Sequence, residues 1–105
     1  MPSVKRGEVW LVDLGMAAKV RPAVVLSIPF QDDERALYAI APHTTATRGG
    51  RFEVIIDAAW LQDGAFDIQG VRNIPGSVFI RRIGALSQSQ MDQITIAMKI
   101  WFGIT

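Results

Sequence analysis

The sequence contains no cysteine and a single histidine, His43, and both shortages narrow the chemistry open to the protein. Without cysteine the chain forms no disulfide, no thiolate nucleophile and no Cys-ligated zinc site. One histidine excludes, within one chain, an acid–base pair built from two histidines. The patterns HExxH, GxxxxGK[ST] and GxGxxG are also absent, which leaves no case for a zinc-protease site or a nucleotide-binding loop. We therefore expect no metal and no cofactor, and we interpret the acidic run 32–34 as a solvated turn.

Long hydrophobic runs are missing too. No uncharged stretch reaches the roughly 18–20 apolar residues that a membrane span needs. The early apolar segment 11–17 is interrupted by Asp13 and does not form a secretory leader. Half of the 105 residues are hydrophobic, which suffices for one compact core. We expect a single domain over residues 1–105, soluble and cytoplasmic.

A strong net charge is absent, because 11 basic and 10 acidic residues leave a total of +1. Total charge thus gives no argument for a polyanionic partner. The distribution is more informative, since the stretches 14–31, 35–52 and 68–91 contain no Asp or Glu. These stretches hold eight basic residues: Lys19, Arg21, Arg35, Arg48, Arg51, Arg72, Arg81 and Arg82. They make a basic surface if the stretches meet in space, and otherwise scatter over a solvated exterior.

The first two thirds of the chain read as short strands separated by turns. Segments rich in β-branched and aromatic residues, or continuously apolar, alternate with Gly and Pro signals. The expected strands are 8–14, 23–28, 36–42, 52–57, 71–74 and 77–83. The run 23–28 is apolar throughout, which suits a strand buried on both faces. Between the fourth and fifth strands, Asp57 is expected to cap a single helical turn over 58–62 that ends at Gly64.

The final segment changes to helical spacing. Ser87 followed by Gln90 is a capping-box pattern, and Gly103 is placed to end a helix. Apolar side chains recur between them at Met91, Ile94, Met98 and Trp101. Five or more short strands followed by one helix predict a mainly β fold, a small and strongly bent antiparallel barrel with a C-terminal helix. The large rings of residues 101–102 near the chain end favour self-association through an apolar surface.

The chemistry that remains is polar and cationic. Arg21 precedes Pro22, which favours extended geometry at the start of the second strand. An arginine held on a rigid strand end can present its planar fork to a phosphate. Hydroxyls and guanidinium groups mix after the third strand, as suits a phosphodiester substrate: Thr44, Thr45, Thr47, Arg48 and Arg51.

Four segments together resemble the MazF/PemK (Kid-like) toxins. They are KRGEVWLVDL (5–14), VRPAVVLS (20–27), APHTTATRGGRFEVIID (41–57) and, more loosely, IRRIGALSQSQM (80–91). The resemblance implies an SH3-like antiparallel β-barrel, a homodimer, and metal-independent cleavage of single-stranded RNA at a short sequence. It also implies a cognate antitoxin whose disordered tail occupies the RNA groove, with operator DNA reached only through that antitoxin.

The resemblance assigns the catalytic roles to Arg21, in VRPAVV, and to Thr44, in APHTTA. Thr45 is the fallback if the alignment slips by one place. RNA binding is expected from the surrounding polar residues: Lys19, Ser27, His43, Thr45, Thr47, Arg48, Arg51, Gln69 and Arg72. The chain departs from the family's pattern at two places. The loop 15–19 is shorter than usual, and Gly70 separates Gln69 from the following Val-Arg pair.

The expected reaction uses the 2′-hydroxyl of RNA as nucleophile, which distinguishes RNA from DNA. Arg21 would stabilise charge on the phosphorane, Thr44 would position an oxygen, and His43 is one candidate for the proton acceptor. Two alternatives remain at this point. The ending KIWFGIT (99–105) resembles the Trp-Gly-Ile tail of CcdB-type gyrase poisons, and a catalytically inactive RNA- or protein-binding barrel would use the same fold.

Overall fold

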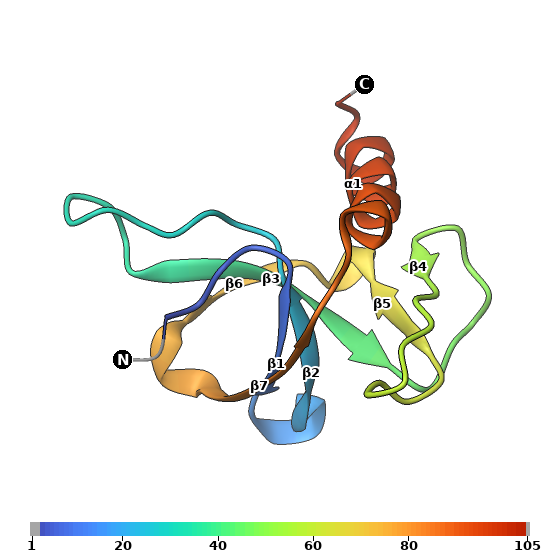
Figure 1. Cartoon of the computed structure of the whole chain (residues 1–105), viewed down its shortest axis with the longest axis horizontal. Coiled ribbons are helices and arrows are strands. Elements are labelled where there is room, and N and C mark those ends of the chain that lie inside the picture. Colours follow the sequence, from blue (N-terminus) through green and yellow to red (C-terminus); the bar gives the residue numbers. More distant parts are fainter. Residues whose placement is uncertain (1–2, 105) are drawn as a thin grey trace.

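A computed structural model describes residues 3–104 of the chain. It contains seven strands: β1 (Glu8–Asp13), β2 (Val20–Val25), β3 (Leu37–Thr44), β4 (Glu53–Val54), β5 (Ala65–Asp67), β6 (Arg72–Pro75) and β7 (Phe79–Ala85). Three short 3-10 helices, η1 (Met16–Ala18), η2 (Ile68–Gly70) and η3 (Gly76–Val78), lie between strands. The chain closes with α1 (Gln88–Phe102). The predicted mainly β fold with a C-terminal helix is therefore confirmed (Figure 1).

All strand pairs are antiparallel, in the order β4-β5-β3-β2-β1-β7, with β6 also paired to β3. β3 is the centre of this arrangement. One of its edges pairs with β2, and its other edge pairs first with β6, over residues 37–40, and then with β5, over residues 43–44. In Figure 1, β6 lies along the first part of β3 and β5 lies beside its last residues.

The sheet is covered on both faces, since successive residues of a strand point to opposite sides. In β1, Val9 faces a cluster that includes Met91 and Ile94 of α1, whereas Trp10 and Val12 face a second cluster. Burying each such aliphatic side chain contributes about 1.5–3 kcal/mol. The expected double burial of the run 23–28 holds for residues 23–26, while Ile28 is exposed.

Local signals placed α1 correctly. The Ser87 hydroxyl accepts a hydrogen bond from the Gln90 N–H at 3.2 Å, and the Gln90 side chain accepts from the Ser87 N–H at 2.8 Å. Gly103 ends the helix in the left-handed conformation, at φ 71°. The buried face of α1 packs against η2 and β4. The capping box thereby fixes where the chain leaves the sheet and begins to cover it.

Three sequence-based expectations need correction. β2 begins at Val20, three residues earlier than expected, so Arg21 lies inside the strand and pairs with Val12. Residues 58–62 form no helix; they make a turn closed by a 3.0 Å bond from the Leu61 N–H to the Ala58 carbonyl. β5 was not expected at all, because three residues are too few to show a periodic pattern.

Within residues 3–104, no helix combines the length and the apolar character needed to cross a bilayer.

Candidate active site

The register of the sheet brings Arg21 beside Thr44. In the pairing of β2 with β3, Ala23 lies opposite Pro42, and the pairing continues to Val25 opposite Ile40. Extending the same register outward by two places sets Arg21 opposite Thr44, and directly opposed residues of antiparallel strands share one face. Both side chains line the same cavity. The catalytic pair expected from the sequence therefore lies together, at the open end of the β2–β3 pairing.

This cavity, called here the arginine cavity, has a volume of about 750 Å³. Each of the three acid-free stretches contributes to it, so the predicted meeting of these stretches does occur. Six of the expected site residues line it: Arg21, Thr44, Arg48, Arg51, Gln69 and Arg72. Four guanidinium groups around one hollow make a site for an anionic, extended ligand.

Two carboxylates of the arginine cavity, Glu53 and Asp67, were missed by the sequence analysis. Glu53 accepts hydrogen bonds from the backbone N–H groups of Arg48, at 2.9 and 3.0 Å, and of Gly49, at 2.8 Å. The N–H of Gly50 adds a longer bond of 3.3 Å. The Glu53 carboxylate thus holds residues 48–50, at the tip of the loop between β3 and β4, by hydrogen bonds. The signal available in the sequence was a Glu three residues after the Gly-Gly turn.

The loop geometry also fixes its second arginine. The guanidinium carbon of Arg51 lies 4.6 Å from the ring centroid of Phe52, within the range of a cation–π contact. Gly49 takes a left-handed conformation, at φ 74°, that a side chain would strain. The loop therefore presents Arg48 and Arg51 on a defined backbone.

The opposite wall of the arginine cavity is η2. The Asp67 carboxylate accepts from the Gln69 N–H at 3.1 Å and caps this short helix. A Cβ on Gly70 would lie 3.0 Å from Cγ of Pro42, so glycine permits the close approach of η2 to β3. The Arg72 Nε then donates to the Gly70 carbonyl at 3.2 Å. The extra glycine between Gln69 and the Val-Arg pair is accommodated by this packing.

His43 lies on the other face of β3 from Thr44 and is buried, with 3% of its surface exposed. Its ring meets that of Phe66 edge-on at 5.1 Å. Burial lowers the pKa of His43 below its usual 6.5, and the positive charge of Arg21 lowers it further. The imidazole is consequently neutral at pH 7. Among the described residues none hydrogen-bonds its Nε2.

A smaller cavity of about 270 Å³ adjoins Arg21 and Thr44. Arg21 and Thr44 line it too, together with Lys19, His43 and Thr45. Lys19 follows η1 with a positive φ of 56°, which is uncommon for a residue with a side chain. The short loop 15–19 is closed by bonds of 3.0 Å from the Leu14 N–H to the Lys19 carbonyl and from the Lys19 N–H to the Gly15 carbonyl. Arg21 and Thr44 thus stand at the junction of two hollows.

Two expected RNA-binding residues are not brought to these cavities. Ser27 lies beyond the far end of β2, where its hydroxyl accepts from the Ala39 N–H at 3.0 Å. Thr47 is exposed in the loop before Arg48 and lines neither hollow. In the part of the chain described, residues 3–104, no cluster of three or more His, Asp or Glu side chains is arranged to hold a metal ion.

Comparison with known proteins decides the family. Residues 5–102 match the family model described as the PemK-like, MazF-like toxin of type II toxin–antitoxin systems. The chain belongs to this family. The match spans nearly the whole chain and does not favour the CcdB-type alternative. The segment that suggested that alternative includes Thr105, which lies outside the described residues.

Individual members of the family agree with this assignment. The chain is 29% identical over 98 residues to the "probable endoribonuclease MazF5" of Mycobacterium tuberculosis (strain ATCC 25618 / H37Rv), covering 90% of this chain and 89% of that protein. The structure of M. tuberculosis toxin MazF-mt6 superposes with a TM-score of 0.79 at 26% identity, over 93% of this chain and 98% of the other. A mycobacterial endoribonuclease solved with its cognate antitoxin gives a TM-score of 0.83 at 18% identity, over 98% of each chain. The two solved structures share the fold of this chain over nearly its whole length.

Proposed function

We propose that the protein is a sequence-selective endoribonuclease that cleaves single-stranded RNA without a metal, as the toxin of a toxin–antitoxin pair. One observation carries the proposal: Arg21 of β2 and Thr44 at the end of β3 line the same two cavities. The surrounding arginines suit a chain of phosphates. The names of the relatives, as endoribonucleases, agree with this reading.

In the proposed reaction the RNA 2′-oxygen attacks the adjacent phosphorus. A new P–O2′ bond forms, the P–O5′ bond breaks, and the proton lost by the 2′-hydroxyl is balanced by one gained at the leaving 5′-oxygen. Arg21 stabilises the negative charge that develops on the phosphorane. The Thr44 hydroxyl accepts a 3.1 Å bond from the Ala46 N–H, which orients it to donate to a phosphate oxygen. DNA lacks the nucleophile and stays intact.

The remaining arginines hold the strand rather than react. Arg48, Arg51 and Arg72 line the arginine cavity around the catalytic pair. Each guanidinium offers a fork that matches a phosphate. His43 is enclosed and its ring packs on Phe66, so its neutral imidazole supports the strand behind Thr44.

The test maps new 5′ ends on a long RNA exposed to the purified protein in EDTA. We expect cleavage at a short recurring sequence, and loss of these ends with Arg21→Ala. Arg35→Ala is the matched control, because Arg35 is an exposed arginine that lines neither the arginine cavity nor its neighbour. Cleavage that required Mg²⁺, or that survived Arg21→Ala, would contradict the mechanism.

Two partners belong to the same proposal: a cognate antitoxin and a second copy of the chain. α1 exposes several large apolar side chains on the side away from the core, among them Ile96 at 60% and Ile100 at 51%. An apolar face of this kind is typical of an interface. Light scattering at increasing concentration, with Ile100→Glu as the comparison, tests the homodimer.

A further inference from the structure

A third hollow shares Arg21 with the two cavities already described. It has a volume of about 500 Å³ and lies between β1, the start of β2, β7 and the turn after β4. We call it the aromatic cavity, and its distinguishing residues are Arg21, Trp60, Gln62, Arg81 and Arg82. Among the described residues that line it, none is acidic. No role in the reaction described above accounts for these side chains other than Arg21.

Trp60 is held flat against the sheet. A Cβ placed on Gly84 would lie 2.5 to 2.6 Å from three indole atoms, Cε2, Cδ2 and Cζ2. Nearly equal distances to three atoms of one ring mean that Gly84 faces the plane of the ring, not its edge. The turn closed between Leu61 and Ala58 fixes the backbone on either side of the tryptophan. One indole face therefore rests on Gly84, while 39% of the residue remains exposed on the cavity side.

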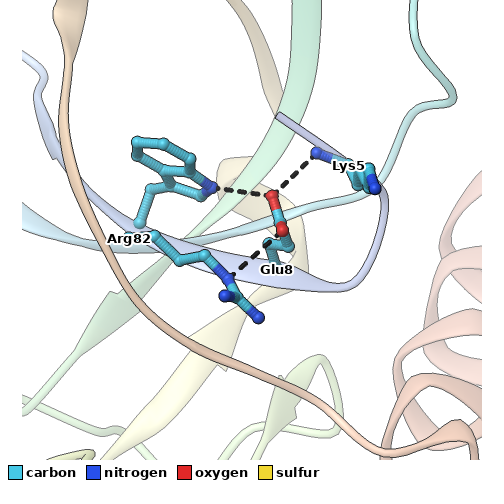
Figure 2. A network of polar contacts seen from close by, with 4 residues as sticks. Lys5, Glu8 and Arg82 are labelled. Atoms are coloured by element: carbon cyan, nitrogen blue, oxygen red, sulfur yellow. Dashed lines mark hydrogen bonds and ion pairs between the residues drawn. The ribbon is translucent and has the colours of Figure 1, made fainter. Parts of the chain in front are cut away.

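The basic wall of the aromatic cavity comes from β7. Two register shifts interrupt the β1–β7 pairing, on either side of the residues that face Trp10 and Leu11. Such bulges redirect side chains, and here they leave both Arg81 and Arg82 exposed at the cavity. Arg82 is tied by a 3.2 Å contact from its Nε to the Glu8 carboxylate (Figure 2).

Glu8 is itself fixed by other donors. Its carboxylate accepts from the Lys5 N–H at 2.8 Å and from the Trp10 Nε1 at 3.1 Å (Figure 2). This network neutralises part of the charge of Arg82. Arg81 is left as the exposed cation of the wall, since no ion pair is present for it among the described residues.

We propose that Trp60 is a base-stacking platform for one nucleotide of the single-stranded RNA next to the cleaved phosphate, with Arg81 on a neighbouring phosphate. This proposal rests on the function proposed above. An aromatic face beside a basic wall is how proteins hold unpaired nucleotides. An acidic peptide would use the arginines but has no need of a flat, open indole. The shared Arg21 joins the platform to the site of cleavage.

The first experiment measures binding of a fluorescently labelled, uniformly 2′-O-methylated RNA oligonucleotide, which lacks the nucleophile and cannot be cut. Base–aromatic stacking contributes enough that Trp60→Leu should raise Kd roughly tenfold. Phe30→Leu is the matched control, because Phe30 is an aromatic side chain that packs on Tyr38 and lines none of the three cavities. Equal Kd for Trp60→Leu and the wild type overturns the proposal.

A second variant displaces the platform without removing it. Gly84→Ala places a methyl group against the indole, so it should raise Kd as Trp60→Leu does. A direct readout uses tryptophan fluorescence of the protein carrying Trp101→Phe, in which the buried Trp10 and the exposed Trp60 are the remaining tryptophans. Saturating oligonucleotide should quench the exposed tryptophan, and an unchanged spectrum overturns the platform.

Failure of this inference can be told from failure of the proposed function. A wild-type protein that neither binds the oligonucleotide nor cuts RNA refutes both. A wild-type protein that cuts RNA, while Trp60→Leu cuts and binds as well as it does, refutes the platform alone. If Trp60→Leu keeps its oligonucleotide affinity but loses affinity for a polyglutamate peptide, the cavity belongs to an acidic protein segment and the platform is again refuted.

Discussion

The sheet positions Arg21 and Thr44, whereas a loop positions Arg48 and Arg51, although all four line one cavity. The first pair lies on two strands, β2 and β3, that are paired with each other at residues 23–25 and 40–42. The loop that carries the second pair is held by hydrogen bonds to one carboxylate, that of Glu53. A rigid strand suits catalytic side chains, because small displacements of these groups slow the reaction, whereas an adjustable loop suits the binding of a flexible RNA strand. The difference predicts separate kinetic roles for the two pairs.

The largest expected effect separates the pairs directly. Arg21→Ala should lower kcat by ~10²–10³, because it removes an oriented donor to the developing charge. Arg48→Ala should instead raise KM and reduce the slope of log KM against log salt by about 0.7, the value for one phosphate contact with a single strand. Steady-state cleavage of a short RNA over a range of salt concentrations measures both. A similar fall in kcat for the two variants would erase the distinction between strand and loop.

A glycine behind Thr44 gives the next effect. Gly64 has a φ of 155°, and a Cβ there would lie 2.1 Å from the Thr44 carbonyl oxygen. Because that oxygen belongs to the backbone of β3, Gly64→Ala should shift the strand, with about 1–3 kcal/mol lost from the free energy of unfolding. Moving Thr44 should also lower kcat by roughly tenfold or more.

Gly50→Ala is the control for this change. Gly50 lies in the loop and has no atom within 4 Å of a built Cβ. Thermal unfolding and kcat should both stay close to the wild type in this variant. Gly64→Ala with normal kcat would show that Thr44 need not be held by the strand.

These contrasts also explain how far the sequence alone could predict the molecule. The ends of α1 were predictable, because a capping box and a terminal glycine act within three or four residues. β5 escaped notice, since its three residues form a strand only by pairing with β3 and β4. The turn at Trp60 was misread as helical because its packing on Gly84 joins residues far apart in sequence.

The residues of the candidate site likewise differ in how far the sequence could predict them. Arg21 and Thr44 were predicted through resemblance to a family, as no local pattern shows that residues 21 and 44 face each other. The role of Glu53 was not predictable, because it depends on the loop returning to its own strand. Ser27 was predicted to bind RNA because it is near Arg21 in the sequence, yet it lies beyond the other end of β2. Because a strand is extended, residues several positions apart along it lie far apart in space.

Loosening the loop should have a moderate effect. Glu53→Ala removes the acceptor for three backbone N–H groups, and hydrogen bonds to a charged group are each worth about 1.5–3 kcal/mol before solvent exposure weakens them. We expect KM to rise on the order of tenfold, with kcat changed far less. Glu34→Ala is the control, because Glu34 likewise accepts from a backbone N–H, that of Gln31, in a loop away from the site. An unchanged KM in Glu53→Ala would show that the loop is held by other contacts.

The smallest effect is the pH dependence that His43, on β3, adds to the free energy of unfolding. Burial and, to a smaller extent, the charge of Arg21 lower the pKa of His43 in the folded protein below 6.5. At pH values between the folded-state pKa and 6.5, the unfolded chain therefore binds the proton more tightly than the folded protein does. The free energy of unfolding should therefore fall as pH falls through about 6.5, and this stability is fully present only above that value. His43→Leu removes the titrating group and keeps an apolar side chain against Phe66, so its stability should be flatter than that of the wild type between pH 8 and pH 5. Urea unfolding at closely spaced pH values gives the difference between the two proteins, in which the carboxylates common to both cancel. Parallel curves over this range would mean that His43 is protonated as readily in the fold as out of it, and that β3 does not shield it.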